Sequence, residues 1–176
     1  RAKSVVDDKS TGLTEDDKED VAEKIGIGAV KYFELSQSRV SDYIFSWDKM
    51  LALQGNTAPY MINAYVRTRS IFRKIGGDFD VSSDTLSITD DSERAIAIKL
   101  CQYSEIVPEV MNDYRPNLLA TYLYELAQSF HSFYEQCPVL SSEGSTRHTR
   151  LALCDSTSKV LKHGLNLLGI YPPDKM

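Results

Sequence analysis

The sequence contains few of the residues that stabilise small secreted domains or bind metals. It has three cysteines in 176 residues, Cys101, Cys137 and Cys154, widely spaced and without a C-x-x-C pair. Its three histidines form no metal-ligating spacing with one another or with these cysteines. We therefore expect neither a disulfide framework nor a metal site, and we interpret the cysteines as buried free thiols in a reducing compartment.

Long apolar runs and the common catalytic motifs are also missing. No apolar stretch approaches the ~20 residues that a membrane-spanning helix needs, and the N-terminus has no run of signal-peptide length. The sequence contains no glycine-rich phosphate loop and no G-x-S-x-G motif. The triplet Gly26-Ile27-Gly28 lacks both a preceding strand and the third glycine of a dinucleotide fingerprint. We expect no membrane partner and no catalytic centre in this chain.

The overall composition is typical of a folded globular protein. Hydrophobic residues make up 42% and charged residues 26% of a chain whose length suits one domain with a short appendage. The formal net charge of −5 argues against extensive coating by nucleic acid, because phosphate contacts require cations. The acidic residues are clustered, notably at 15–20 and 84–93. A local basic surface is therefore compatible with the negative total.

Apolar residues recur at helical spacing over most of the chain, which predicts an all-α helical bundle. Residues 1–26 predict two helices that are separated near Gly12, and we expect the second to end at Gly26. A short helix over 28–35 should follow, and the alternating residues 39–47 predict either a short strand or an extended connector.

The remainder of the chain predicts further helices joined by polar loops. Their ranges are 48–53, 59–75, 92–101, 106–111, 116–137 and 150–168. The 116–137 helix is expected to be the longest, and Pro108 is expected in the first turn of its own helix. Residues 78–92 predict a polar surface loop, and Gly76 and Gly169 are expected to end the helices before them.

The 59–75 helix carries the clearest candidate binding surface. Four cations lie on it, interleaved with two tyrosines: Arg67, Arg69, Arg73, Lys74, Tyr60 and Tyr65. Arginine with aromatic rings can hold phosphate and stack unpaired bases of single-stranded RNA. The alternative interpretation is a solvated helix face whose tyrosines belong to the core.

Two further segments could contribute to such a surface. Near the end of the 116–137 helix, Phe130 and Phe133 are expected in the core, whereas Tyr134 could leave its ring on the surface. The tail, residues 171–176, is either a frayed end or, because its two prolines make it stiff, a segment that folds back and places Met176 against a site.

Four ordered blocks of the sequence resemble the C-terminal part of arginyl-tRNA synthetases. They are residues 31–51, the segment GNTAPYMINAYVR at 55–67, the helix beginning PNLLATYLYELA at 116, and residues 150–170 with the terminal methionine. The resemblance implies a helical bundle of the class I synthetase anticodon-binding type over residues 46–176. Residues 1–45 would be the tail of the catalytic region, and a first residue other than methionine fits a piece of a longer protein.

The resemblance also implies a function. The longer cytoplasmic enzyme would attach arginine to tRNA(Arg), using ATP with magnesium, on an upstream catalytic domain of the same chain. The HIGH-type and KMSKS-like motifs of that domain are absent here. We therefore expect this part to be inactive alone, to need no cofactor, and to bind the anticodon of tRNA(Arg).

In this family, residues from the 59–75 helix, the end of the 116–137 helix and the C-terminus form a pocket for the central anticodon base. By position, Arg67 corresponds to the family's arginine, Tyr134 to its stacking tyrosine and Met176 to its terminal residue. Asn63 completes the tRNA-binding set.

The sequence departs from the family pattern at two places. Asn63 stands where the family often has a tyrosine, so one stacking platform is either lost or replaced by Tyr65. Pro138 falls near a position where some members carry an aromatic residue.

Two other functions remain open from the sequence. One is a helical protein-interaction module that uses the acidic surface and needs no RNA. The other is the anticodon-binding domain of a related class I synthetase that handles another amino acid.

Overall fold

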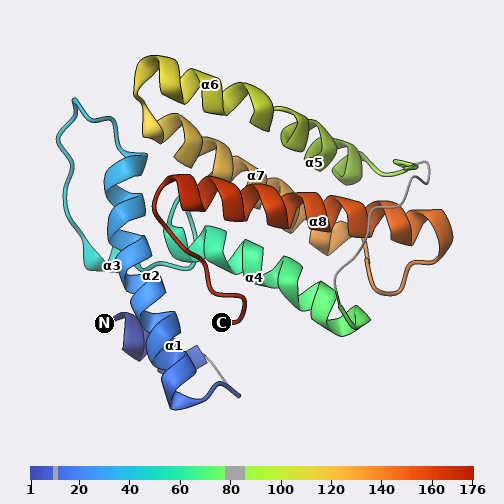
Figure 1. Ribbon diagram of the computed structural model, residues 1–176, viewed down its shortest axis with the longest axis horizontal. Coiled ribbons are helices and arrows are strands. Elements are labelled where there is room, and N and C mark those ends of the chain that lie inside the picture. The colour runs from blue at the N-terminus through green and yellow to red at the C-terminus, as the bar shows by residue number, and fades with distance from the viewer. Residues whose placement is uncertain (10–11, 78–85) are drawn as a thin grey trace.

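The protein is a bundle of helices in the computed structural model, which describes residues 1–9, 12–77 and 86–176 (Figure 1). No strand occurs in these ranges, so the predicted all-α class is confirmed. The helices are α1 (Ala2–Lys9), α2 (Glu15–Ser36), α3 (Trp47–Met50), α4 (Ala58–Ile75), α5 (Asp91–Cys101), α6 (Tyr103–Asp113), α7 (Pro116–Gln136) and α8 (Gly144–Leu167).

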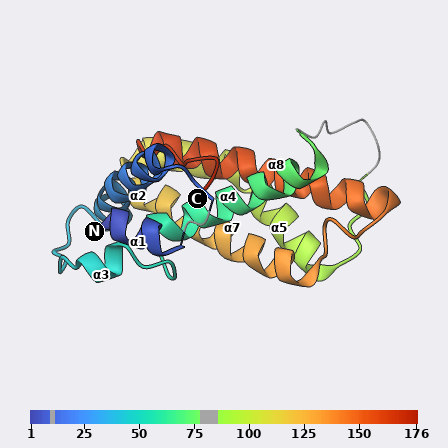
Figure 2. The same ribbon diagram turned by 90° about the horizontal axis from the view of Figure 1, so that it is seen from below.

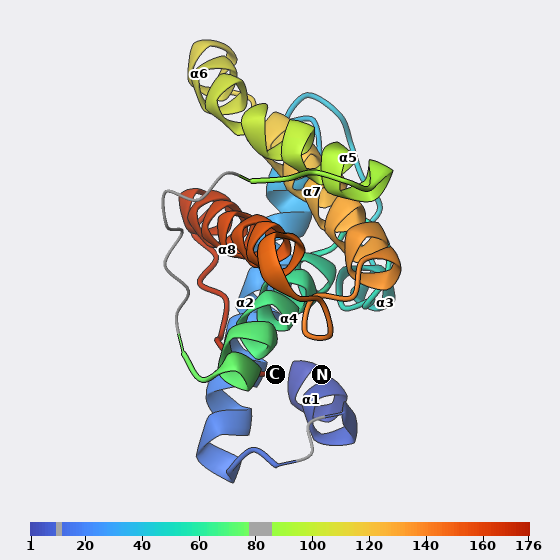
Figure 3. The same ribbon diagram turned by 90° about the vertical axis from the view of Figure 1, so that its right-hand side faces the viewer.

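Helix α7 is the centre of the bundle and packs against α2, α4, α5, α6 and α8. Figure 3 shows α1 and α6 at opposite ends of the molecule. The hydroxyl of the buried Tyr32 shares its single proton between two acceptors, the Asn56 side-chain oxygen (2.6 Å) and the Ala120 carbonyl (2.8 Å). These two bonds join α2 to α7 and to the turn before α4, because the phenol cannot be left unpaired in the core.

The prediction that a helix ends at Gly26 is wrong, because α2 runs without a break to Ser36. Its glycines serve close packing instead of termination. A Cβ atom at Gly28 would lie 3.0 Å from Ile170 Cγ2, and one at Gly26 would lie 3.2 Å from Ala2 Cβ. The contacts that select glycine therefore come from the two distant ends of the chain, which local spacing does not reveal.

Several other boundaries also differ from the prediction. Helix α8 begins at Gly144 and, with 24 residues, is longer than α7, which has 21. Helix α6 holds Pro108 in its interior rather than in its first turn. Residues 39–46 form an irregular connector without a strand.

The loop predicted at 78–92 lies partly outside the described residues, at 78–85, and α5 begins at Asp91. The expected end of α4 is confirmed by Gly76, whose left-handed φ of 94° suits glycine. All three cysteines are free, but the prediction of burial fails for Cys101, which is exposed. Within the described ranges, every helix is too short or too polar to cross a bilayer.

Gly164 lets α8 approach α7 closely. A Cβ there would lie 2.6 Å from Cδ2 of the fully buried Leu123. In the Gly164→Ala variant, overpacking should lower the free energy of unfolding by about 1–3 kcal/mol. The higher helix propensity of alanine should offset up to about 1 kcal/mol of this loss. Gly26→Ala is the control, because its neighbour Ala2 lies on a short terminal helix that can shift. Equal urea midpoints for the two variants would contradict this account.

Candidate nucleic-acid interface

Helix α4 is built from local signals that fix where its side chains point. The Thr57 hydroxyl caps the helix by accepting from the Tyr60 amide (3.3 Å) and donates to the Ala52 carbonyl (2.7 Å). Pro59 lies in the first turn, where its missing N–H costs nothing. With both ends fixed, Tyr60 and Arg67, seven residues apart, lie on the same side of the helix.

Arg67 lies over the ring of Tyr134, at the last turn of α7. Its guanidinium carbon is 5.0 Å from the ring centroid, a cation–π geometry. Its Nη1 is 3.5 Å from Nδ1 of His131. A guanidinium only donates hydrogen bonds, so Nδ1 accepts and the His131 proton is assigned to Nε2. All three side chains are partly exposed.

Further rings continue this cluster along the contact between α4 and α7. The Tyr60 ring lies 4.9 Å from the His131 ring and 5.6 Å from that of Tyr124, measured between centroids. The buried Phe130 lies 6.0 Å from Tyr134 and supports it from the core side. We call Tyr60, Tyr124, His131 and Tyr134 the aromatic row. Each of its four members is partly exposed.

The electrostatics of the row favour neutral rings beside one fixed cation. Burial and then the Arg67 charge lower the pKa of His131, so its imidazole is neutral near pH 7. Burial and then Tyr124 raise the pKa of Tyr60, so its phenol keeps its proton. A neutral aromatic surface with an arginine at its edge matches a nucleobase and its phosphate.

The C-terminal tail folds back over α4, which overturns the frayed-end alternative. The C-terminus lies beside α4 in both Figure 1 and Figure 2. Asp174 accepts from the Tyr65 hydroxyl (2.5 Å), and its carbonyl accepts from Arg73 Nη1 (2.6 Å). Met176 is partly buried against the core.

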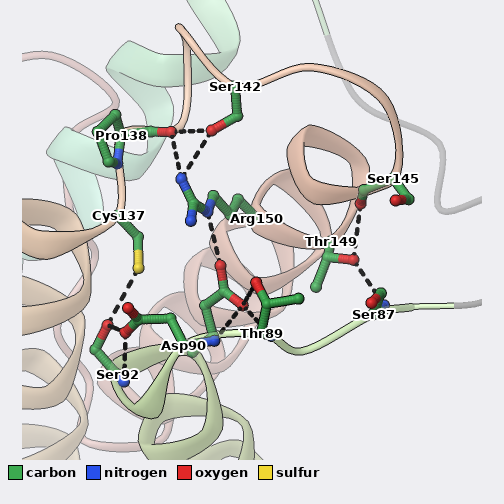
Figure 4. A network of polar contacts seen from close by, with 11 residues as sticks. Ser87, Thr89, Asp90, Ser92, Cys137, Pro138, Ser142, Ser145, Thr149 and Arg150 are labelled. Atoms are coloured by element: carbon green, nitrogen blue, oxygen red, sulfur yellow. Dashed lines mark hydrogen bonds and ion pairs between the residues drawn. The ribbon is translucent and has the colours of Figure 1, made fainter.

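A buried ion pair holds the loop that follows α7 (Figure 4). Arg150 on α8 donates from Nε to the Glu93 carboxylate (2.7 Å) and from Nη1 to the Pro138 carbonyl (2.9 Å) and the Ser142 hydroxyl (2.8 Å). Glu93 is fully buried and also accepts from the Thr89 amide (2.8 Å). This network joins the start of α5, the start of the 137–143 loop and α8, and so fixes the end of α7 that carries Tyr134.

Comparison with known proteins identifies the family. Residues 61–176 match the DALR anticodon binding domain. The chain belongs to this family. Residues 1–47 match the catalytic domain of class I (R) tRNA synthetases. The arginine–tRNA ligase of Mannheimia succiniciproducens is 49% identical over the whole chain, and that of Synechocystis is 51% identical over 93% of it.

Solved structures agree with this assignment. The arginyl-tRNA synthetase of Thermus thermophilus is 32% identical and superposes over the whole chain with a TM-score of 0.88. That of Plasmodium falciparum is 36% identical over 91% of the chain, with a TM-score of 0.79. This DALR chain spans 31% of the Mannheimia enzyme, 28% of the Synechocystis enzyme, 30% of the Thermus chain and 28% of the Plasmodium chain. The resemblance seen in the sequence is confirmed, and it favours RNA binding over a protein-interaction module.

The DALR domain brings some of the predicted site residues together. Arg67 and Tyr134 are in contact, and Asn63 is partly exposed one turn before Arg67 on the same side of α4. The suggestion that Tyr65 replaces a stacking platform is wrong, because Tyr65 is 1% exposed and its hydroxyl is bonded to Asp174. The placement of Met176 beside Arg67 stays a prediction.

Three side chains of this DALR domain were missed by sequence reasoning. His131 and Tyr124 were not assigned to the site, and neither was Asp174. Helical spacing held a signal for two of them, because Tyr124 and His131 are seven apart and His131 and Tyr134 are three apart, so they share one side of α7. Asp174 gave no such signal, since its partners lie on α4 over 100 residues away.

Proposed function

We propose that the chain recognises the anticodon loop of tRNA(Arg) as the C-terminal part of an arginine–tRNA ligase. The observation that carries the proposal is the Arg67 guanidinium over the partly exposed Tyr134 ring, at the edge of the aromatic row. Membership of the DALR family and the arginine–tRNA ligases among the relatives support it.

Recognition would combine stacking with charge. The central anticodon base stacks on Tyr134, and Arg67 donates to the base or to its phosphate. Neutral His131, with its proton on Nε2, offers one further donor. Asn63 supplies an amide in place of a ring, and Met176 closes the pocket with an apolar side chain. Stacking contributes about 1–3 kcal/mol per base but discriminates little between bases, so selection of the central base would rest on the hydrogen bonds from Arg67, His131 and Asn63.

The chemistry of the ligase would lie in the upstream catalytic domain. There ATP, with magnesium, activates arginine before its transfer to tRNA(Arg), and the chain described here is inactive alone. We place the boundary so that residues 1–45 belong to the catalytic region and 46–176 to the anticodon-binding domain, a division supported by the two family matches. We assign the enzyme to the cytoplasm, where tRNA charging takes place.

The proposal is tested by titrating the chain with labelled anticodon stem-loops of tRNA(Arg). We expect the loop with its own central base to bind more tightly than loops carrying each of the other three bases. Affinity should also fall as salt concentration rises, because phosphate contacts release counterions. Fluorescence anisotropy measures both effects. Equal affinity for all four loops would remove the recognition claim.

A further inference from the structure

An exposed carboxylate lies at the end of the aromatic row. Glu135 directly follows Tyr134 in the last turn of α7, four residues after His131 and eleven after Tyr124. These spacings place Glu135 on the same side of the helix as His131 and Tyr124. Glu135 is exposed, and within the described ranges it forms no hydrogen bond or ion pair. The helix geometry therefore puts a negative charge beside the rings.

The rings of the row lie near two opposite charges. For His131, burial and the Arg67 charge lower the pKa, whereas the Glu135 charge raises it. For Tyr60, burial, Tyr124 and Glu135 raise the pKa, whereas Arg67 lowers it. Arg67 Nη1 is itself 3.5 Å from Nδ1 of His131. A ligand on these rings would therefore meet a cation and an anion together.

The turn of α7 that carries Glu135 is held in place by two bonds formed just after it. The Cys137 amide donates to the Phe133 carbonyl (2.8 Å), and Arg150 donates from Nη1 to the Pro138 carbonyl (2.9 Å). The backbone at Glu135 is therefore ordered before any ligand binds. A hydrogen bond to its carboxylate requires only the side chain to become fixed, which limits the entropic cost of binding.

A carboxylate beside an RNA-binding surface is unfavourable unless it makes a specific contact. It repels phosphate groups, whereas cations attract them. A carboxylate only accepts hydrogen bonds, and the exocyclic amino groups of nucleobases are donors that carboxylates recognise. Arg67 and His131 supply donors for acceptor atoms on the same base edge.

Cytosine and adenine match this combination of charges. Each carries an amino group next to an unprotonated ring nitrogen, so one edge donates to a carboxylate and accepts from a guanidinium. Uracil has a carbonyl oxygen in place of the amino group of cytosine. That oxygen would face the carboxylate with no proton between them. A base site that combines Arg67 with Glu135 therefore disfavours uracil.

We propose that Glu135 selects a central anticodon base that has an exocyclic amino group, by accepting a hydrogen bond from that group. The inference rests on the proposed function and adds an acceptor to the donors of Arg67 and His131. The carboxylate weakens the general attraction to phosphate, and it penalises a base that presents a carbonyl oxygen at the same position.

The contact is tested by removing its two partners separately. Anticodon stem-loops of tRNA(Arg) are prepared with central cytosine or with central pyrimidin-2-one, which lacks only the amino group. We expect the wild-type chain to bind the cytosine loop roughly fivefold to hundredfold more tightly, the discrimination that one good base contact provides. Glu135→Ala should bind the two loops with equal affinity. Fluorescence anisotropy measures this double-mutant cycle.

Two further variants separate the hydrogen bond from the charge. Glu135→Gln keeps an acceptor oxygen, so it should retain part of the preference for cytosine while binding both loops more tightly. Glu109→Ala removes an exposed charge on α6, outside the aromatic row, and should keep the full wild-type preference. Both positions are exposed, so circular dichroism should be unchanged in all three variants.

The outcomes distinguish this inference from the proposed function. A wild-type preference for cytosine that persists in Glu135→Ala, with or without an equal gain in affinity for both loops, would overturn the inference. If the wild-type chain distinguishes the four natural bases but not cytosine from pyrimidin-2-one, the inference alone fails. If the wild-type chain binds all four natural loops equally, the proposed function fails.

Discussion

Replacing Arg67 with alanine is expected to weaken binding of the tRNA(Arg) anticodon loop by about tenfold to a hundredfold. Hydrogen bonds from charged groups contribute about 1.5–3 kcal/mol, and the guanidinium also supports the Tyr134 ring. Arg67 and its partner His131 are both partly exposed, so water can replace the guanidinium when it is removed. Circular dichroism should therefore be unchanged while fluorescence anisotropy reports the loss.

The matched control for this prediction is Lys74→Ala. Lys74 is exposed, carries the same charge and lies seven residues further along α4, on the same side as Arg67. Its removal should reduce affinity slightly and equally for every loop, through the lost general attraction to phosphates. Arg67→Ala should instead also reduce the preference for the correct central base. Unchanged binding by Arg67→Ala would count against the pocket.

The largest expected effect on stability comes from Glu93→Ala. Glu93 is fully buried, and its loss leaves the partly buried Arg150 guanidinium without its carboxylate. Breaking a buried ion pair from one side costs about 3–5 kcal/mol of unfolding free energy. The denaturant midpoint measures this loss. Lys159→Ala, which removes a surface partner of Asp155, is the control and should cost no more than about 1 kcal/mol.

The same carboxylate predicts how stability depends on pH. Burial alone would raise the pKa of Glu93, but the Thr89 amide and the Arg150 guanidinium together lower it below the ordinary value. The ionised Glu93 side chain therefore contributes its full stabilisation above the pKa that glutamate has in the unfolded chain. This contribution is lost as pH falls through the lowered pKa of Glu93 in the folded protein. The Glu93→Gln variant lacks this contribution. The difference in unfolding free energy between the wild-type chain and this variant should therefore become smaller at acidic pH. A constant deficit at every pH would contradict this assignment.

Local chemistry decided which helix boundaries could be predicted. Helix α4 was placed to within a residue because Pro59 and Gly76 act on their immediate neighbours. Helix α2 was divided wrongly because the roles of Gly26 and Gly28 depend on residues at the two ends of the chain. Spacing in the sequence indicates the backbone conformation that a glycine prefers. Gly26 and Gly28 are instead required because other segments pack closely against them.

The candidate site shows the same limit. Resemblance to a family assigned Arg67 and Tyr134, and the structure shows that they touch. No pattern within α4 could show that Tyr65 points towards the tail, because its partner is 109 residues away. His131 was overlooked since a lone histidine on an amphipathic helix resembles any partly buried polar residue. The contact between α4 and α7 is what brings it within reach of Arg67.

The two glycines of α2 have a mechanical consequence. Within two turns of this helix, Gly26 contacts Ala2 closely, Gly28 contacts Ile170, and Lys31 donates to the carbonyl of Gly169. Helix α1 and residues 169–170 are thus packed against the same few residues of α2. A displacement of this part of α2 would therefore shift both α1 and residues 169–170.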